Sequence, residues 1–116
     1  MAYQVRIEGI AADTGQVILA MKPNWWDAYE LREDERFVDK YDKTGSYIDY
    51  EAKVSVVEMK HIHEKYKKET TTGLYALPEW QEVIQPKLRE LDEALYSWPD
   101  AYSHFNITVF EWESGY

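Results

Sequence analysis

The chain has 116 residues and a formal net charge of −9, and 45% of its residues are hydrophobic and 16% aromatic. This size and composition are typical of one folded domain, so we predict a single domain over residues 1–116 and exclude extensive disorder. The negative charge disfavours direct binding of nucleic acid or of an anionic membrane, and it favours encounter with basic partners.

Three absences narrow the possible classes of protein further. The chain has no cysteine, which excludes a disulfide framework, a thiol nucleophile and a thiolate metal site. No apolar run approaches the ~20 residues that span a bilayer. The N-terminal residues alternate like a strand and show no secretory signal, so we expect a cytoplasmic protein.

The N-terminal part of the chain has the pattern of a hairpin. Residues 3–9 alternate between apolar and polar side chains, which is the period of a strand with one buried face. Residues 13–15, Asp-Thr-Gly, predict a turn, and residues 17–21 continue as a short apolar strand. Pro23 should end this second strand because proline has no amide hydrogen to donate.

Residues 24–41 give the weakest local pattern. Asn24 followed by Asp27 resembles a helix start, so we predict a helical turn over about residues 24–29, followed by an extended segment that ends near Tyr41; Tyr29, Leu31 and Glu33 could equally begin a strand. Whether residues 24–36 are helix, strand or loop is left open by the pattern. Residues 42–45, Asp-Lys-Thr-Gly, predict the turn of a second hairpin.

Residues 46–66 change period within one stretch. Residues 48–56 alternate as a strand, and the apolar positions that follow have the spacing of an amphipathic helix. Ser55 and Glu58 form a potential capping box, although the strand pattern continues to Val57. The buried stripe of this helix is expected to contain Met59, Ile62, His63 and Tyr66.

A second helix and a final strand follow. Pro78 suits the first turn of a helix, and Pro86 predicts a kink or two short helices. Residues 105–112 alternate as a last strand. The apolar seam of the helix is expected to contain Trp80, Ile84, Leu88, Leu91, Leu95 and Trp98.

These elements predict an α+β fold with about five strands. Two N-terminal hairpins and the C-terminal strand should form a mainly antiparallel sheet, with two helices packed on one face. The strand order is not fixed by the pattern, because the last strand could pair with the first strand or with the third.

No motif indicates an enzyme, a metal site or a cofactor. The serines lack a nucleophile elbow and the five glycines are scattered, so neither nucleophilic catalysis nor a phosphate loop is predicted. His61 and His63 point to opposite sides of a helix, and His63 lies on the apolar stripe, where a packed histidine is commoner than a metal ligand.

The candidate site is instead a cluster of aromatic and acidic residues for binding a partner. In extended chain two adjacent tryptophans face opposite ways, so one should pack inward and leave the other available outside. Tryptophan and tyrosine favour binding hot spots, and a carboxylate rim speeds association with a basic surface. The predicted partner-binding residues are Trp25, Trp26, Asp27, Tyr29, Glu30, Glu33, Asp34 and Glu35.

We therefore expect a non-catalytic acidic protein that inhibits a basic protein partner. The partner would be a toxin or a nucleic-acid-binding protein, and the chain would act like an immunity protein, an antitoxin or a mimic of nucleic acid. One alternative is an interaction or assembly subunit that acts as a homodimer. Another is a small-ligand-binding domain or enzyme with an aromatic pocket.

Overall fold

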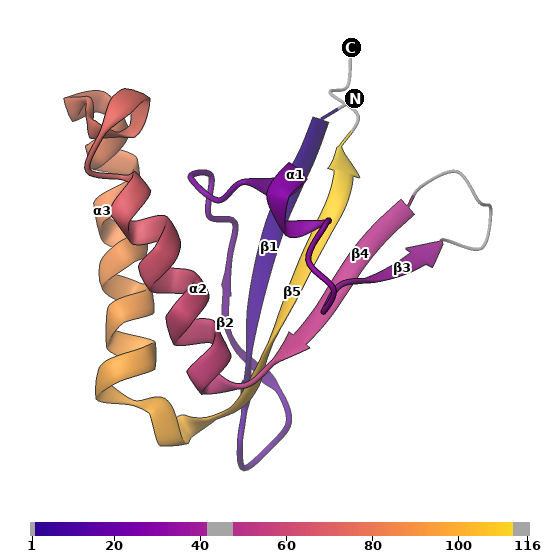
Figure 1. Ribbon diagram of the computed structural model, residues 1–116. Helices are drawn as coiled ribbons and strands as arrows, with labels where there is room; N and C mark the ends of the chain where they lie inside the picture. The colour runs from indigo at the N-terminus through magenta and orange to yellow at the C-terminus, as the bar shows by residue number, and fades with distance from the viewer. Residues whose placement is uncertain (1, 42–47, 113–116) are drawn as a thin grey trace.

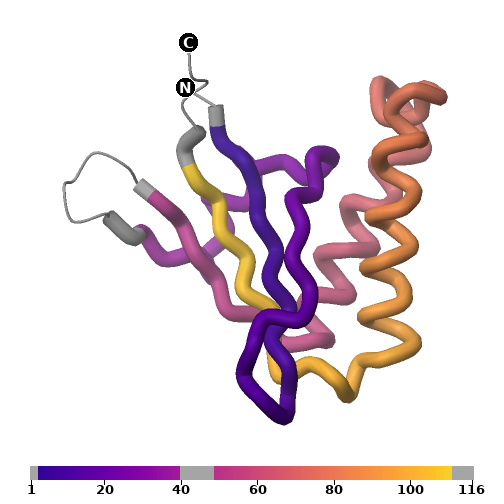
Figure 2. Tube along the Cα trace, turned by 180° about the vertical axis from the view of Figure 1, so that it is seen from behind, coloured from indigo at the N-terminus to yellow at the C-terminus, as the bar shows by residue number. Residues whose placement is uncertain are grey.

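The computed structural model describes residues 2–41 and 48–112, and in them five strands form one sheet. Neighbouring strands are all antiparallel and lie in the order β2-β1-β5-β4-β3. Figure 2 shows β1 and β5 side by side along the middle of this sheet. The strands are β1 (Ala2–Ala11), β2 (Val17–Met21), β3 (Val38–Tyr41), β4 (Ile48–Val54) and β5 (Tyr102–Trp112).

Two long helices, α2 and α3, run side by side next to the sheet, and the short α1 lies in front of β1 (Figure 1). One hydrophobic core joins all of them to the sheet, so the α+β prediction is confirmed. No helix in the described part of the chain is both long and apolar enough to cross a bilayer. The helices are α1 (Ala28–Leu31), α2 (Val56–Glu69) and α3 (Pro78–Asp92), with short helical turns η1 (Gly73–Ala76), η2 (Glu93–Ser97) and η3 (Pro99–Ala101).

The N-terminal hairpin forms as the sequence predicts. β2 covers residues 17–21, and Ile7 of β1 lies opposite Met21 at its end. Gly15 in the turn has a φ of 72°, a left-handed conformation that glycine adopts without steric cost. The pairing of β2 with β1 involves β1 only from Ile7 onward. The chain leaves the edge of β1 before Pro23.

The junction between β4 and α2 resolves the overlap of the strand and helix patterns in favour of the helix. Ser55 Oγ accepts a hydrogen bond from the Glu58 backbone N–H at 3.1 Å, and Glu58 Oε1 accepts one from the Ser55 N–H at 3.1 Å. This complete capping box starts α2 at Val56. The four stripe residues predicted from the helical spacing are all buried.

Residues 24–41 differ from the prediction. The helical turn begins at Ala28 and is capped by Asp27, whose carboxylate accepts from the backbone N–H groups of the next turn, so Asn24 is not the cap. The extended segment begins only at Val38, where β3 pairs antiparallel with β4. The turn predicted at residues 42–45 lies outside the described residues.

α3 is one helix, so of the two alternatives predicted at Pro86, that of two short helices is wrong. Residues 78–92 are continuous through Pro86, whose exposed position places the missing hydrogen bond toward solvent. A π-helical turn, η2, follows and changes the number of residues per turn. The seam predicted along α3 consequently holds as far as Leu95 and fails at Trp98, which is exposed.

β5 is the central strand of the sheet. It pairs with β1, one of the two predicted neighbours, and with β4 instead of the third strand. Phe105, Ile107 and Val109 of β5 are fully buried and point toward the helices, which the contacts of β5 with α2 support. The sheet is thereby covered at its centre by the two long helices.

Candidate functional site

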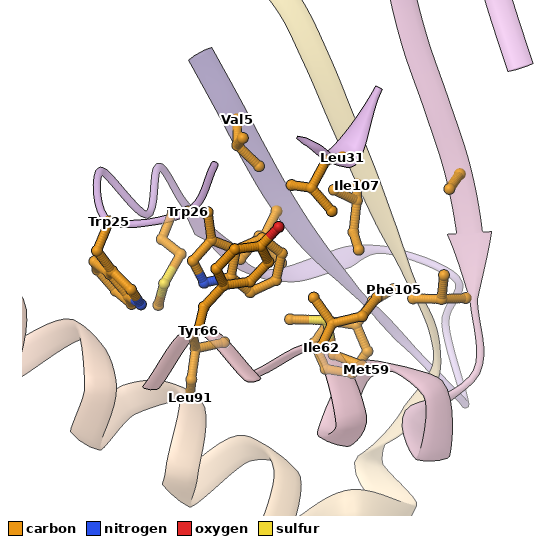
Figure 3. Packing of buried hydrophobic residues seen from close by; sticks show 14 of the residues in the cluster. Val5, Trp25, Trp26, Leu31, Met59, Ile62, Tyr66, Leu91, Phe105 and Ile107 are labelled. Atoms are coloured by element: carbon orange, nitrogen blue, oxygen red, sulfur yellow. The ribbon is translucent and has the colours of Figure 1, made fainter. Parts of the chain in front are cut away.

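Trp25 and Trp26 are both buried, so the prediction that one of them faces outward is wrong. Their side chains lie between the sheet and the helices (Figure 3), with 1% and 5% of their surface exposed. The Trp26 ring stacks on Tyr66 of α2, with the ring centroids 5.2 Å apart. Residues 24–26 form a turn and not extended chain, and alternation between two faces does not apply to a turn.

Three of the predicted carboxylates are used inside the protein. Asp27 caps α1. Glu30 accepts hydrogen bonds from Lys65 and from the hydroxyl of Tyr66, the latter at 2.8 Å, and these bonds lower the pKa of Glu30. Asp34 forms a bidentate pair with Arg36, at 2.9 and 2.8 Å, and the side-chain hydrogen bonds from this guanidinium lower the pKa of Asp34 to about 2.

The remaining predicted residues are exposed, and two of them lie beside Arg32. Tyr29 packs edge-on against Tyr3, with the centroids 5.2 Å apart, and the guanidinium of Arg32 lies 5.4 Å from the Tyr29 ring centroid. Glu33 Oε1 is 3.7 Å from Arg32 Nε. Glu35 is exposed. The structure thus brings the predicted residues together, but it buries their indoles and pairs most of their carboxylates.

A second aromatic and acidic region lies at the C-terminal end of α3. Trp98 is 62% exposed there, beside a hollow of about 230 Å³ between α3 and the edge strand β2. We call this region the Trp98 surface. The residues that define it are Ile18, Glu90, Glu93, Trp98 and Tyr102, all of which line the hollow.

The Trp98 surface carries negative charge, and within residues 2–41 and 48–112 no cation lines it. Glu93 Oε1 accepts a hydrogen bond from the indole Nε1 of Trp98 at 3.3 Å, which orients the ring. Burial raises the pKa of the Tyr102 hydroxyl, and the negative charges of Glu90 and Glu93 raise it further. The carboxylates of Glu90 and Glu93 therefore lie near an exposed aromatic side chain, that of Trp98.

Sequence reasoning missed this surface because it assigned Trp98 to the buried seam of the helix. Pro99 carried the missing signal, since a residue that precedes proline is disfavoured in the helical conformation. The structure agrees with that restriction: Trp98 has a φ of −129° and a ψ of 43°. The π-helical turn before it adds a change of phase that hydrophobic spacing alone does not predict.

A third polar cluster links α2 to α3. His63 is fully buried on the stripe of α2, and its Nε2 lies 2.7 Å from Asp92 Oδ1. Lys67 Nζ donates to Asp92 Oδ2 at 3.0 Å. Burial raises the pKa of Asp92, but the hydrogen bonds from His63 and Lys67 outweigh it and leave the pKa lowered.

Together with Glu64, this cluster contains the group of described residues whose ligand atoms lie close enough to hold a metal ion, all within 4.8 Å of one another. His63 Nε2 and the Asp92 carboxylate already have protein partners, and Glu64 Oε1 accepts from the hydroxyl of Tyr96 at 2.8 Å. The buried imidazole of His63 is also closed to a substrate. The geometry is that of an interhelical link.

Comparison with known proteins finds no matching protein family, no matching curated protein and no matching solved structure. The chemistry of the two aromatic and acidic regions is therefore what indicates a function. Of these, the Trp98 surface combines an exposed indole with carboxylates that no lysine or arginine of its lining neutralises.

Proposed function

We propose that this protein is a non-catalytic inhibitor that binds a basic protein partner through the Trp98 surface. The observation that carries the proposal is the exposure of Trp98 beside a hollow rimmed by Glu90 and Glu93. A tryptophan with a free face supplies a large apolar contact area, and tryptophan is enriched among residues whose truncation weakens binding most.

The charge of the chain supports the same class of partner. A net charge of −9 attracts a cationic surface over long distances and accelerates association, and the carboxylates beside Trp98 would then meet lysine or arginine side chains at close range. Proteins that bind nucleic acid have such surfaces. A nuclease-like toxin whose cationic surface is covered by this protein would lose access to its substrate. The protein would then act like an immunity protein or an antitoxin.

A second copy of this chain is a weaker candidate for the same surface. A two-fold symmetric dimer places the same patch on both sides of the interface, so Glu90 and Glu93 of each copy would approach those of the other. Like charges brought together in an interface cost several kcal/mol, in order of magnitude. Light scattering over a range of concentrations separates a monomer from such a dimer.

The test uses immobilised protein to capture partners from cells of the source organism, with Trp98→Ala as the first variant. We expect a captured protein that is basic, whose affinity for the purified wild type falls steeply with salt. Trp98→Ala should weaken that affinity by about 30-fold or more, as truncation of a hot-spot residue does. If the captured protein is an enzyme, its inhibition should be lost in the same variant.

Matched variants distinguish loss of the Trp98 surface from the general effect of losing an exposed apolar or charged side chain. Leu74→Ala removes another exposed apolar side chain, and Glu82→Gln removes an exposed charge from α3 outside the lining of the hollow. Both should leave binding nearly unchanged, whereas Glu90→Gln should slow association and reduce the salt dependence. A partner that is acidic, that binds independently of salt, or that binds Trp98→Ala as tightly as the wild type would contradict the proposal.

A further inference from the structure

A cavity of about 390 Å³ lies beside the N-terminal half of β1, where β2 no longer pairs with it. We call it the cationic cavity. The lining residues that define it here are Tyr3, Gln4, Lys22, Asn24, Trp26 and Lys87. The cavity exists because the chain leaves the edge of β1 after Met21 and places Trp25 and Trp26 in the core.

The charged residues of this lining are both cations. Lys22 and Lys87 contribute, and no aspartate or glutamate among the described residues lines the cavity, although acidic residues outnumber basic ones in the chain by 22 to 13. Lys87 Nζ donates to the Lys22 carbonyl oxygen at 3.0 Å, and Lys22 Nζ lies 5.7 Å from the Phe110 ring centroid. Among the described residues, neither ammonium group pairs with a carboxylate, so both can turn toward an anion.

The third feature is a buried hydrogen-bond donor. Trp26 lines the cavity, is 95% buried, and its indole Nε1–H has no acceptor within the described protein. A buried donor without a partner costs about 1–3 kcal/mol. The nitrogen atom itself is closed to solvent, so Trp26 contributes to the lining through other atoms of its ring.

We propose that the cationic cavity binds a small organic anion with a flat apolar body and one carboxylate. The volume falls within the range of about 300–1,000 Å³ typical of ligand sites. The rings of Tyr3 and Trp26 contribute apolar surface for the flat body, and Lys22 and Lys87 supply the positive charge for the carboxylate. This site does not depend on the Trp98 surface, because the two linings share no residue.

The test compares 2-naphthoate with its uncharged analogue 2-naphthamide, using full-length protein labelled with ¹⁵N. Titration calorimetry gives the affinity, and the assigned Trp26 indole Nε1–H resonance reports the site. We expect saturable one-to-one binding of 2-naphthoate with a shift of that resonance. 2-Naphthamide should bind about tenfold more weakly, because it lacks the charge that strengthens a hydrogen bond to an ammonium group. Inorganic phosphate, which has no apolar body, should not compete.

Three lysine variants test the role of charge, two inside the lining and one control outside it. Lys22→Met and Lys87→Met keep the aliphatic stem and should each weaken 2-naphthoate binding by about tenfold, while Lys68→Met, at an exposed position outside the lining, should not. Unfolding curves check that all three variants remain folded. The proposal is overturned if the acid and the amide bind equally, if phosphate competes, if all three variants weaken binding alike, or if the Trp26 resonance does not move.

Discussion

The segment from Trp25 to Glu35 and the Trp98 surface are made of the same kinds of residue, yet the fold treats them in opposite ways. In the first, both indoles are buried and Glu30 and Asp34 bind cations of the same chain. In the second, the indole is exposed and the carboxylates beside it face solvent. An aromatic and acidic sequence is therefore not by itself a binding surface.

Two local causes account for the difference. The first segment lies next to Arg32, Arg36 and Lys65, and each of them lies within 4 Å of one of its carboxylates. This segment also begins with a turn, and the turn directs both tryptophan side chains into the core. The end of α3 has no such cations in its hollow, and the π-helical turn directs Trp98 outward. Local pairing and backbone direction decide which cluster remains available.

The strongest test of this comparison is truncation of a tryptophan in each region. Trp26→Ala should lower the free energy of unfolding by about 3–5 kcal/mol, because a large buried side chain leaves a cavity. Trp98→Ala should change it by about 0.5 kcal/mol or less, as exposed substitutions do. Urea unfolding monitored by circular dichroism measures both. Equal losses in the two variants would show that the contrast in burial does not hold in solution.

Gly9→Ala tests how firmly the sheet holds the Trp98 surface, through Tyr102. A Cβ on Gly9 would lie 2.6 Å from Tyr102 Cε1 and 3.0 Å from Phe105 Cε1, and these two rings stack with their centroids 4.9 Å apart. We expect a loss of about 1–3 kcal/mol in the free energy of unfolding, as for other overpacked sites.

The control for Gly9→Ala is the same substitution in a Tyr102→Ala background. The added methyl group should cost less there, because the nearest ring is gone, and urea unfolding of the four proteins gives the coupling between the two sites. An unchanged cost would mean that the strain arises elsewhere and that Tyr102 is not fixed against β1.

The sequence predicted most of the fold because its periodic segments agree with the final packing. β2 has the predicted bounds, the stripe of α2 is buried as expected, and the capping box at Ser55 is complete. It did not predict that β5 pairs with β4, because the alternation of a strand identifies its buried face and not its neighbours.

The candidate site was predicted less well, for physical reasons visible at particular residues. Asp34 and Arg36 are two positions apart, so their pairing could have been expected, but Glu30 meets Lys65 only through the tertiary fold. The burial of Trp25 depends on the direction of a turn that has no periodic signal. The exposure of Trp98 depends on a π-helical turn, for which hydrophobic spacing gives no warning.

Two tyrosines sharpen the comparison between buried and exposed regions, because each donates the same kind of hydrogen bond in a different environment. Tyr66 and Tyr96 both donate to a glutamate oxygen at 2.8 Å, but Tyr66 is 1% exposed and Tyr96 is 51% exposed. Tyr66→Phe should cost about 1 kcal/mol in the free energy of unfolding, the typical net value of one such bond. Tyr96→Phe should cost about 0.5 kcal/mol or less. Equal costs, measured by urea unfolding, would deny that burial strengthens the bond to Glu30.

The smallest effect is expected from the ion pair between Asp34 and Arg36, and it has a defined pH dependence. The pKa of Asp34 is lowered from 3.8 to about 2, so the folded state favours the ionised carboxylate. The stabilisation is therefore present above pH 3.8 and is lost as the pH falls toward 2. At neutral pH, Asp34→Asn should reduce the free energy of unfolding by less than about 1 kcal/mol, since the pair is partly exposed and screened by salt.

The measurement for Asp34→Asn is the difference in unfolding free energy from the wild type at a series of pH values. That difference should be constant above about pH 5 and should shrink as the pH falls through about 2, because the wild-type carboxylate is then increasingly protonated in the folded state as well. Glu33→Gln is the matched control for loss of a carboxylate, since Glu33 is 77% exposed beside Arg32, and it should change the free energy of unfolding by about 0.5 kcal/mol or less. If Asp34→Asn shows no pH dependence, Asp34 is not held by Arg36, and its carboxylate would join Glu35 as part of an open acidic surface.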